Sequence, residues 1–193
     1  MNSPQELQVL RRLTDVFDGL NIVYAIGGSK ASSVYGVVRF TQDADINVQP
    51  FLSVADKLYE MLRDDFHISK QAMYQALKSR GSFNIIHFET SFKIDVFVQA
   101  DNDFEEQLLS RRRKINLGDS LEKSLYFVSP EDIILLKLKW YNQDGCVSER
   151  QWSDVLGVLA VQAERLDFKY LTQWAVKLGL NELLQRAILQ SQT

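Results

Sequence analysis

The sequence predicts a mixed α/β fold, a small mixed β-sheet flanked by helices, with a C-terminal helical module. Short apolar runs rich in β-branched residues alternate with segments whose apolar residues recur every three or four positions. Two of the strand-like runs follow each other across a short polar turn, which predicts a hairpin. After residue 128 only helical patterns remain. We therefore expect an α/β domain at residues 1–128 and a helical domain at 129–193 packed on it.

The α/β half is expected to begin with a helix, because Ser3, Pro4 and Glu6 form the start of a capping box. Leucines then recur at helical spacing as far as Leu20. The elements expected next are a strand at 22–26, a helix at 29–35 capped by Ser29, a strand at 44–48, helices at 54–62 and 69–79, a hairpin of strands at 82–89 and 92–98, a helix at 104–111 and an edge strand at 124–128.

The helical half carries clear start signals. Ser129 and Pro130 open an apolar helix that is expected to reach about residue 141. A second capping box, Ser148 to Gln151, opens the next helix. Two further helices are expected near 167–178 and 180–190.

Composition narrows the class of protein. Of 193 residues, 46% are apolar and 24% charged, as in soluble globular proteins, and no apolar run is long enough for a membrane span. The N-terminal residues lack the pattern of a signal peptide, and Cys146 is the single cysteine, so we expect a reducing, cytoplasmic location. One cysteine and two histidines exclude an ordinary structural zinc site. A net charge of −3 gives no general attraction for nucleic acid.

Asp43 and Asp45 are the first candidate functional residues. Residues two apart on a strand point to the same face, so the two carboxylates would lie side by side. Their repulsion is removed by a divalent cation such as Mg²⁺, which prefers hard oxygen ligands. A solvated strand end explains the pair equally simply.

A third carboxylate, Asp95, lies within a strand-like run of apolar residues, on the face opposite Ile94 and Val96. Aspartate is poorly suited to such a strand unless it meets a partner. If this strand lies beside the strand of Asp45, three carboxylates converge, as a two-metal site for phosphoryl or nucleotidyl transfer requires.

Gly27, Gly28 and Ser29 join the strand at 22–26 to the next helix. Glycines allow the backbone to approach a ligand closely, and the helix N-terminus offers free N–H groups to an anion. A tight turn with no ligand is the alternative.

These residues together resemble the DNA polymerase β-type nucleotidyltransferases. The resemblance rests on Gly28-Ser29, thirteen intervening residues, the Asp43-Ala44-Asp45-Ile46 segment and the later Ile94-Asp95-Val96 strand. The finer pattern, which includes Tyr35-Gly36, Arg39 and Thr41, is most similar to stand-alone bacterial members of the AbiEii toxin and MNT antitoxin groups. Residues 129–141 and 148–159 resemble the helical module of uncharacterised bacterial relatives. Ala44 departs from the pattern, since a larger aliphatic residue is usual there.

The resemblance implies roles for these positions. Asp43 and Asp45 would bind magnesium, and Asp95 would bind a second ion and help the acceptor lose its proton. Gly27, Gly28 and Ser29 form the turn whose last two residues would hold the β- and γ-phosphates of a nucleoside triphosphate such as ATP. Arg39 would neutralise the transferring phosphate, or else be a solvated loop arginine.

Two basic features have alternative explanations. Lys137 lies on an apolar helix face, where it either extends to water or contacts a nucleotide phosphate, as the lysine that resembling relatives share at this position suggests. The run from Arg111 to Lys114 either binds a polyanion such as a tRNA end or is a solvated helix end.

The expected function is magnesium-dependent transfer of a nucleoside monophosphate from a triphosphate to a hydroxyl or protein acceptor, with release of pyrophosphate. A protein, a tRNA and a small molecule all remain open as acceptors. The alternative is an antitoxin-like or scaffold protein that binds a toxin or antitoxin partner and catalyses little.

Overall fold

The computed structural model describes residues 4–117 and 124–192, and it has a mixed α/β fold as predicted. By internal contacts the chain divides into two compact units. The first contains Met1–Gly27 and Phe40–Phe127, and the second contains Gly28–Arg39 and Val128–Thr193. These units differ from the expected domains 1–128 and 129–193 mainly by segment 28–39, and the domain division itself stays a prediction.

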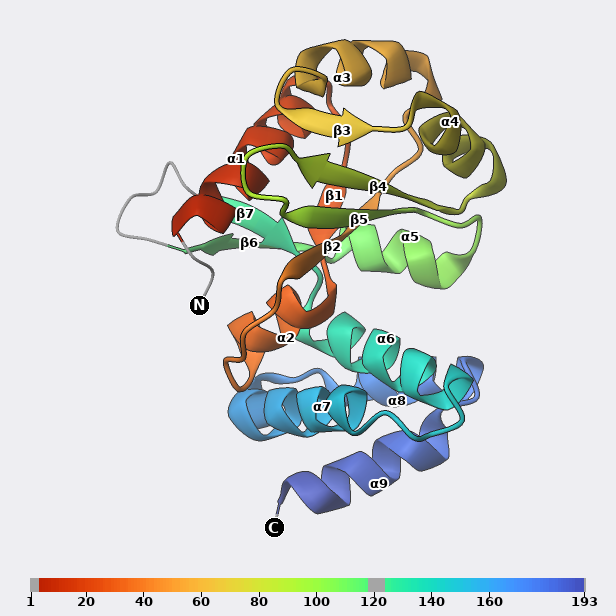
Figure 1. Ribbon diagram of the computed structural model, residues 1–193. Coiled ribbons are helices and arrows are strands. Elements are labelled where there is room, and N and C mark those ends of the chain that lie inside the picture. The colour runs from red at the N-terminus through yellow and green to blue at the C-terminus, as the bar shows by residue number, and fades with distance from the viewer. Residues whose placement is uncertain (1–3, 118–123, 193) are drawn as a thin grey trace. The chain divides into compact units, whose positions relative to one another are not determined.

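The first unit is built on one mixed sheet, in which the described residues provide seven strands in the order β3-β4-β5-β2-β1-β7-β6 (Figure 1). Its strands are β1 (Tyr24–Ile26), β2 (Asp43–Val48), β3 (Phe66–Ile68), β4 (Ser82–His87), β5 (Lys93–Val98), β6 (Arg113–Asn116) and β7 (Ser124–Phe127). Its helices are α1 (Pro4–Gly19), α3 (Ala55–Leu62), which follows a short 3₁₀ turn, α4 (Lys70–Ser79) and α5 (Asp103–Ser110).

The sheet combines parallel and antiparallel pairs. β2 is parallel to β5 and antiparallel to β1, while β4 pairs antiparallel with both β3 and β5. β7 is parallel to β1 and antiparallel to β6. The hairpin expected at 82–98 is thus confirmed.

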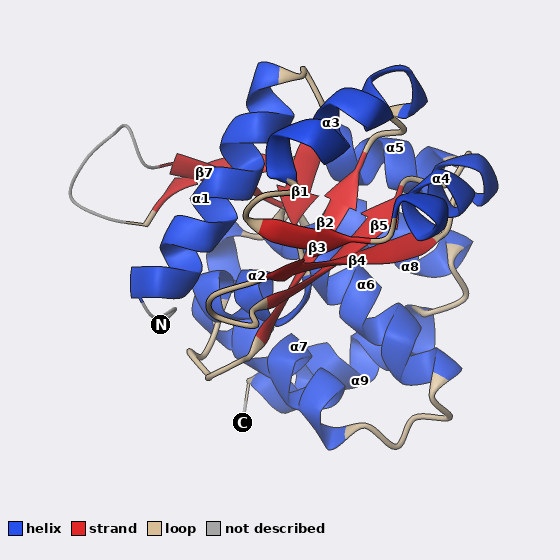
Figure 2. Cartoon of the chain, turned by 45° about the horizontal axis from the view of Figure 1, so that its top comes forward, coloured by secondary structure: helices blue, strands red, loops and turns tan. Residues whose placement is uncertain are grey.

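One face of the sheet is apolar and forms the core. Ala44, Ile46 and Val48 of β2 are fully buried, and their register partners on β5 are Ile94, Val96 and Val98. Helices α1, α3 and α4, which contact one another in turn, cover this face (Figure 2). Because side chains alternate along a strand, the opposite face receives the polar residues of the same strands.

The second unit consists of helices in the described residues. They are α2 (Gly28–Tyr35), α6 (Pro130–Gln143), α7 (Glu149–Gln162), α8 (Phe168–Lys177) and α9 (Asn181–Ser191). Ser129 caps α6 and Ser148 caps α7, each accepting a bond from a backbone N–H three residues later, as predicted. Within residues 4–117 and 124–192, no helix is long and apolar enough to cross a bilayer.

Several predicted details were wrong or lie outside the described residues. Segment 124–128 is not an edge strand, because β7 pairs on both sides and β6 forms the edge. The basic run 111–114 is a helix end only in part: Arg111 is the C-cap of α5, whereas Arg113 and Lys114 belong to β6. β3 was not predicted.

Helix α2 begins at Gly28, with φ of +54°, so Ser29 lies in its first turn and does not precede it. The cap expected at Ser3 lies outside the described residues.

Helices α2 and α7 approach closely at Gly36. A Cβ at Gly36 would lie 2.8 Å from the backbone of Gly157 and Val158. We therefore expect Gly36→Ala to lower the free energy of unfolding by about 1–3 kcal/mol, as overpacking does. Urea denaturation followed by circular dichroism measures it. Gly19→Ala is the matched control, since nothing lies within 4 Å of its added Cβ. An equal effect of both changes would contradict this account of the α2–α7 contact.

Candidate active site

The three predicted aspartates lie on one face of the sheet in the first unit. Asp45 on β2 is the register partner of Asp95 on β5, and Asp43 precedes Asp45 by two residues. Register partners on parallel strands point to the same side. Asp43 is exposed and the other two are half-buried, whereas the alternating Ala44 and Ile94 are fully buried on the opposite face. The sheet therefore brings Asp45 and Asp95 together and holds Asp43 beside them.

Lysine 93 shares this acidic face. It is the register partner of Asp43, and its Nζ lies 2.9 Å from Oδ2 of Asp95. The hydrogen bond to Asp95 raises the pKa of Lys93; desolvation opposes this effect, and the charges of Asp95, Asp43 and Asp45 add to it. Since all three carboxylates act on one ammonium group, Lys93 compensates part of their mutual repulsion.

The outermost acid is oriented by the loop before β2. The hydroxyl of Thr41 donates a hydrogen bond of 2.6 Å to Oδ1 of Asp43. This bond leaves the second carboxylate oxygen of Asp43 and its remaining lone pairs available as hard oxygen ligands.

The donor types on this face fit magnesium, because they are carboxylate oxygens from adjacent strands. In their present conformations, however, the described residues contain no group of three acidic, histidine or cysteine side chains arranged to hold a metal ion. The ammonium group of Lys93 also lies against a carboxylate oxygen of Asp95 that a metal ion would need.

The glycine turn is connected to the acidic strand through its backbone. The N–H of Gly27 donates a 2.8 Å hydrogen bond to the carbonyl oxygen of Asp45. This bond continues the pairing of β1 with β2 beyond Ile26. The chain passes into the second unit immediately afterwards, at Gly28.

The second unit gathers the other predicted residues around one carboxylate, Asp154 of α7. The guanidinium of Arg39 binds both oxygens of Asp154, with Nε 2.8 Å from Oδ1 and Nη2 3.0 Å from Oδ2. Nζ of Lys137 lies 2.8 Å from Oδ2. Arg39 also donates to the hydroxyl of Ser29 in the first turn of α2. Ser29, Arg39, Lys137 and Asp154 thus form one polar cluster, which we call the Asp154 cluster.

Burial makes the Asp154 cluster an electrostatic unit. The side chains of Lys137 and Asp154 are 3% and 5% exposed, so the ammonium group does not extend to water. Arg39, at 27%, is not a solvated loop residue. Burial raises the pKa of Asp154, but the hydrogen bond from Arg39 and the charge of Lys137 outweigh it, so the net pKa is below its ordinary value. With both cations charged, the three ionised groups sum to +1.

Asp154 was missed by the sequence analysis. A signal was present: three and four residues after Asp154 on the same helix lie Gly157 and Val158, which are buried. An acid with small and apolar neighbours at these spacings faces a protein interior, where it needs a cationic partner.

Comparison with solved structures shows that several nucleotidyltransferase-like proteins share the fold of this chain. The structure is similar to the antibiotic-resistance factor ANT(2'')-Ia, with a TM-score of 0.60 and 12% identity over 94% of this chain and 97% of that one. It is similar to the lincosamide antibiotic adenylyltransferase LnuA bound to lincomycin, at 0.52 and 13% identity over 82% and 98%. It is also similar to an antigenic nucleotidyltransferase-like protein from Paracoccidioides brasiliensis, at 0.56 and 18% identity over 96% and 93%.

A second structure of ANT(2'')-Ia, in complex with adenylyl-2''-tobramycin, matches with a TM-score of 0.59 at 12% identity over 98% of this chain and 99% of that one. No family model and no curated protein matches the sequence. At such identities the likeness establishes a nucleotidyltransferase-like fold.

We expect Asp154→Asn to lower the free energy of unfolding by roughly 3 kcal/mol at neutral pH, because it leaves two cations with a neutral partner in a buried site. The pKa of Asp154 is lowered by folding, so the wild-type advantage is full above the ordinary aspartate pKa and is lost as pH falls through the folded value. Urea denaturation between pH 7 and pH 2.5 measures this difference. Asp64→Asn, at an 89% exposed side chain, is the control and is expected to change little.

Proposed function

We propose that this protein transfers a nucleoside monophosphate from a nucleoside triphosphate to a hydroxyl acceptor. The acceptor oxygen forms a bond to the α-phosphorus, the bond from that phosphorus to the bridging oxygen breaks, pyrophosphate leaves, and the hydroxyl proton passes to a base. The observation that carries the proposal is the pairing of Asp45 with Asp95 on parallel strands, with Asp43 on the same face. Similarity to adenylyltransferase folds supports it.

In this proposal Asp43 and Asp45 bind magnesium through hard carboxylate oxygens, and Asp95 adds a ligand and receives the acceptor proton. Bound magnesium ions supply charge neutralisation at the phosphates and lower the pKa of the attacking hydroxyl. The register supports this role for Asp95: it is the partner of Asp45 on the adjacent strand, so the two carboxylates would act on the same reacting group.

The residues proposed to hold the phosphates are Gly28, Ser29, Arg39 and Lys137. Arg39 and Lys137 are two cationic side chains held together at Asp154, and guanidinium and ammonium groups are the usual partners of phosphate oxygens. A guanidinium already fixed by two bonds to a carboxylate loses little side-chain entropy on binding phosphate. Gly28 has a positive φ and no side chain, so a phosphate could approach the backbone closely where α2 begins.

Small hydroxyl-bearing molecules are the acceptors to test first. ANT(2'')-Ia has been seen with adenylyl-2''-tobramycin and LnuA with lincomycin. A protein or tRNA acceptor remains within the proposed chemistry, as does the closer relation to the AbiEii and MNT groups.

One observation favours a second candidate function. Because Lys93 is ion-paired with Asp95, the acidic face is partly charge-compensated without any metal. A scaffold or antitoxin-like protein that binds a partner and catalyses little would have this property.

The first experiment substitutes the acids. Asp43→Asn, Asp45→Asn and Asp95→Asn should each reduce transfer of label from α-³²P-labelled nucleoside triphosphates by roughly 100-fold or more, since each removes a charged ligand at the reacting phosphate. Asp64→Asn, far more exposed, should retain wild-type transfer. Acceptors are aminoglycosides, a lincosamide, tRNA and a cell extract. Absence of any transfer by the wild-type protein, with Mg²⁺ and all acceptors present, would contradict the proposal.

The second experiment separates the two candidate functions by metal binding. Lys93→Gln removes the ammonium group that competes for Asp95, so the affinity for Mn²⁺, used as a spectroscopic probe for Mg²⁺, should rise several-fold. Electron paramagnetic resonance titration of free Mn²⁺ measures it. In the Asp45→Asn background the same change should have little effect. Undetectable Mn²⁺ binding in both wild type and Lys93→Gln would support the scaffold function.

A further inference from the structure

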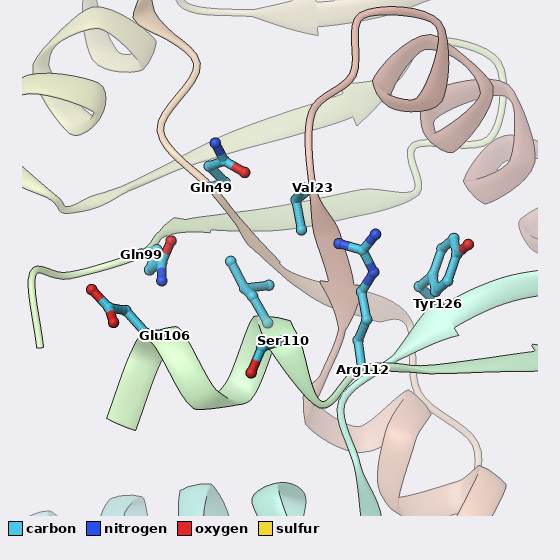
Figure 3. A pocket seen from close by; sticks show the side chains of 8 residues that line it. Val23, Gln49, Gln99, Glu106, Ser110, Arg112 and Tyr126 are labelled. Carbon is cyan, nitrogen blue, oxygen red and sulfur yellow. The ribbon is translucent and has the colours of Figure 1, made fainter. Parts of the chain in front are cut away.

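A second candidate site lies in the first unit, at the end of the sheet away from Asp43. It is a pocket of about 500 Å³ in which the ends of β2 and β5 meet helix α5 and strand β7 (Figure 3). Ligand sites commonly have volumes of roughly 300–1,000 Å³ and a few convergent polar groups. The inference from this pocket does not depend on the proposed transferase function.

Strand register places the pocket relative to the acidic face. Val48 and Val98 are register partners, and Gln49 and Gln99 come directly after them. Both glutamines therefore lie on the same face of the sheet as Asp45. Gln49 lies four positions after Asp45, or about 13 Å along the strand. Asn47, between them, is buried, so the pocket is a separate site.

Two opposite charges line the pocket. The guanidinium of Arg112 lies 4.4 Å from the ring centroid of Tyr126, and the ring restricts it by a cation–π contact. Glu106 lines the pocket from α5, at the side opposite Arg112 (Figure 3). A guanidinium suits a carboxylate, because its planar fork matches the two oxygens. A carboxylate suits an ammonium group.

The wall between these charges is neutral. Gln49 and Gln99 present amide groups that can both donate and accept, and Val23 and Leu109 add apolar surface. Such a wall matches a molecule with amide groups and small apolar parts between two charged ends.

We propose that this pocket binds a short zwitterionic peptide of two or three residues. Its carboxylate binds Arg112, its ammonium group binds Glu106, and its amide groups bind Gln49 and Gln99. Because Glu106 and Arg112 lie at opposite sides of the pocket (Figure 3), we infer a ligand whose charges are farther apart than the single carbon atom between those of a free amino acid; each further residue adds about 3.5 Å. One cation and one anion among the lining residues favour a ligand that carries both charges over a phosphate dianion.

Calorimetric titration of the full chain tests the proposal with glycyl-L-leucine, its N-acetyl derivative, its C-terminal amide and AMP. Glycyl-L-leucine should bind saturably, and each capped form should bind roughly tenfold more weakly or worse, since each lacks one charge-assisted bond. Arg112→Gln should weaken the dipeptide similarly but leave the affinity of its amide unchanged. Glu106→Gln should likewise weaken binding of the dipeptide but leave the affinity of its N-acetyl derivative unchanged. Each substitution and its matching capped ligand thus form a double-mutant cycle.

Neighbouring residues supply matched controls. Arg113→Gln and Glu105→Gln remove the same charges one position away, outside the lining residues, and should not alter binding. Circular dichroism checks that each variant is folded. If Arg112→Gln does not fold, the double-mutant cycle with Glu106→Gln and the N-acetyl dipeptide tests the proposal by itself. The proposal is overturned if glycyl-L-leucine shows no saturable binding at millimolar concentration, if its capped forms bind equally well, or if AMP binds more tightly.

Discussion

The parallel pairing of β2 with β5 is the constraint on which the first unit depends. Side chains alternate on both strands, so one register decides two things together. It packs Ile46 against Val96 on the apolar face and sets Asp45 opposite Asp95 on the polar face. A slip of β5 by one residue against β2 would turn Val96 to the polar face and Asp95 into the core, each at a cost of several kcal/mol. The stability of the core therefore enforces the geometry of the acidic face.

An ion pair and partial exposure to water explain why acids are tolerated in the central strands β2 and β5. Asp45 and Asp95 repel each other, and neither lies at a sheet edge. Lys93 offsets this repulsion, and partial exposure leaves the carboxylates in contact with water. A cation that displaces Lys93 must provide at least as much favourable interaction. In the proposed function, triphosphate-bound magnesium would satisfy this condition better than a free ion, since it would bring further oxygen ligands with it.

Much of the fold could be predicted because its local signals agree with its tertiary structure. Ser129 and Ser148 cap the helices they were expected to cap, and the hairpin that ends in β5 has the predicted pairing. β6 could not be predicted, because lysine and asparagine, two of its four residues, are depleted in strands. Its strand exists through pairing with β7, where Arg112 and Lys114 contact the ring of Tyr126. Without β6, segment 124–128 resembled an edge.

The candidate site could be predicted only in part, because some of its contacts join residues far apart in the sequence. The acids could be found because carboxylates in apolar strands are locally anomalous, but the pairing of Lys93 with Asp95 depends on side-chain conformation. Asp154 belongs to a helix more than a hundred residues from Arg39, and their bidentate contact has a sequence separation of 115. No local pattern encodes such a contact. Only the charge of Asp154, beside buried Gly157 and Val158, indicated that a partner was needed.

The Asp154 cluster raises a question of energy that bears on function. Replacing a buried ion pair by well-packed apolar residues is often neutral or stabilising, so packing alone gives no reason to keep one. Here two cations share one carboxylate, and Lys137 lies among the fully buried Ile133, Ile134 and Leu138. Together the two cations contact both carboxylate oxygens of Asp154, so the carboxylate fixes the position of both. If Arg39 and Lys137 contact a triphosphate as proposed, Asp154 would keep both cations oriented before it binds.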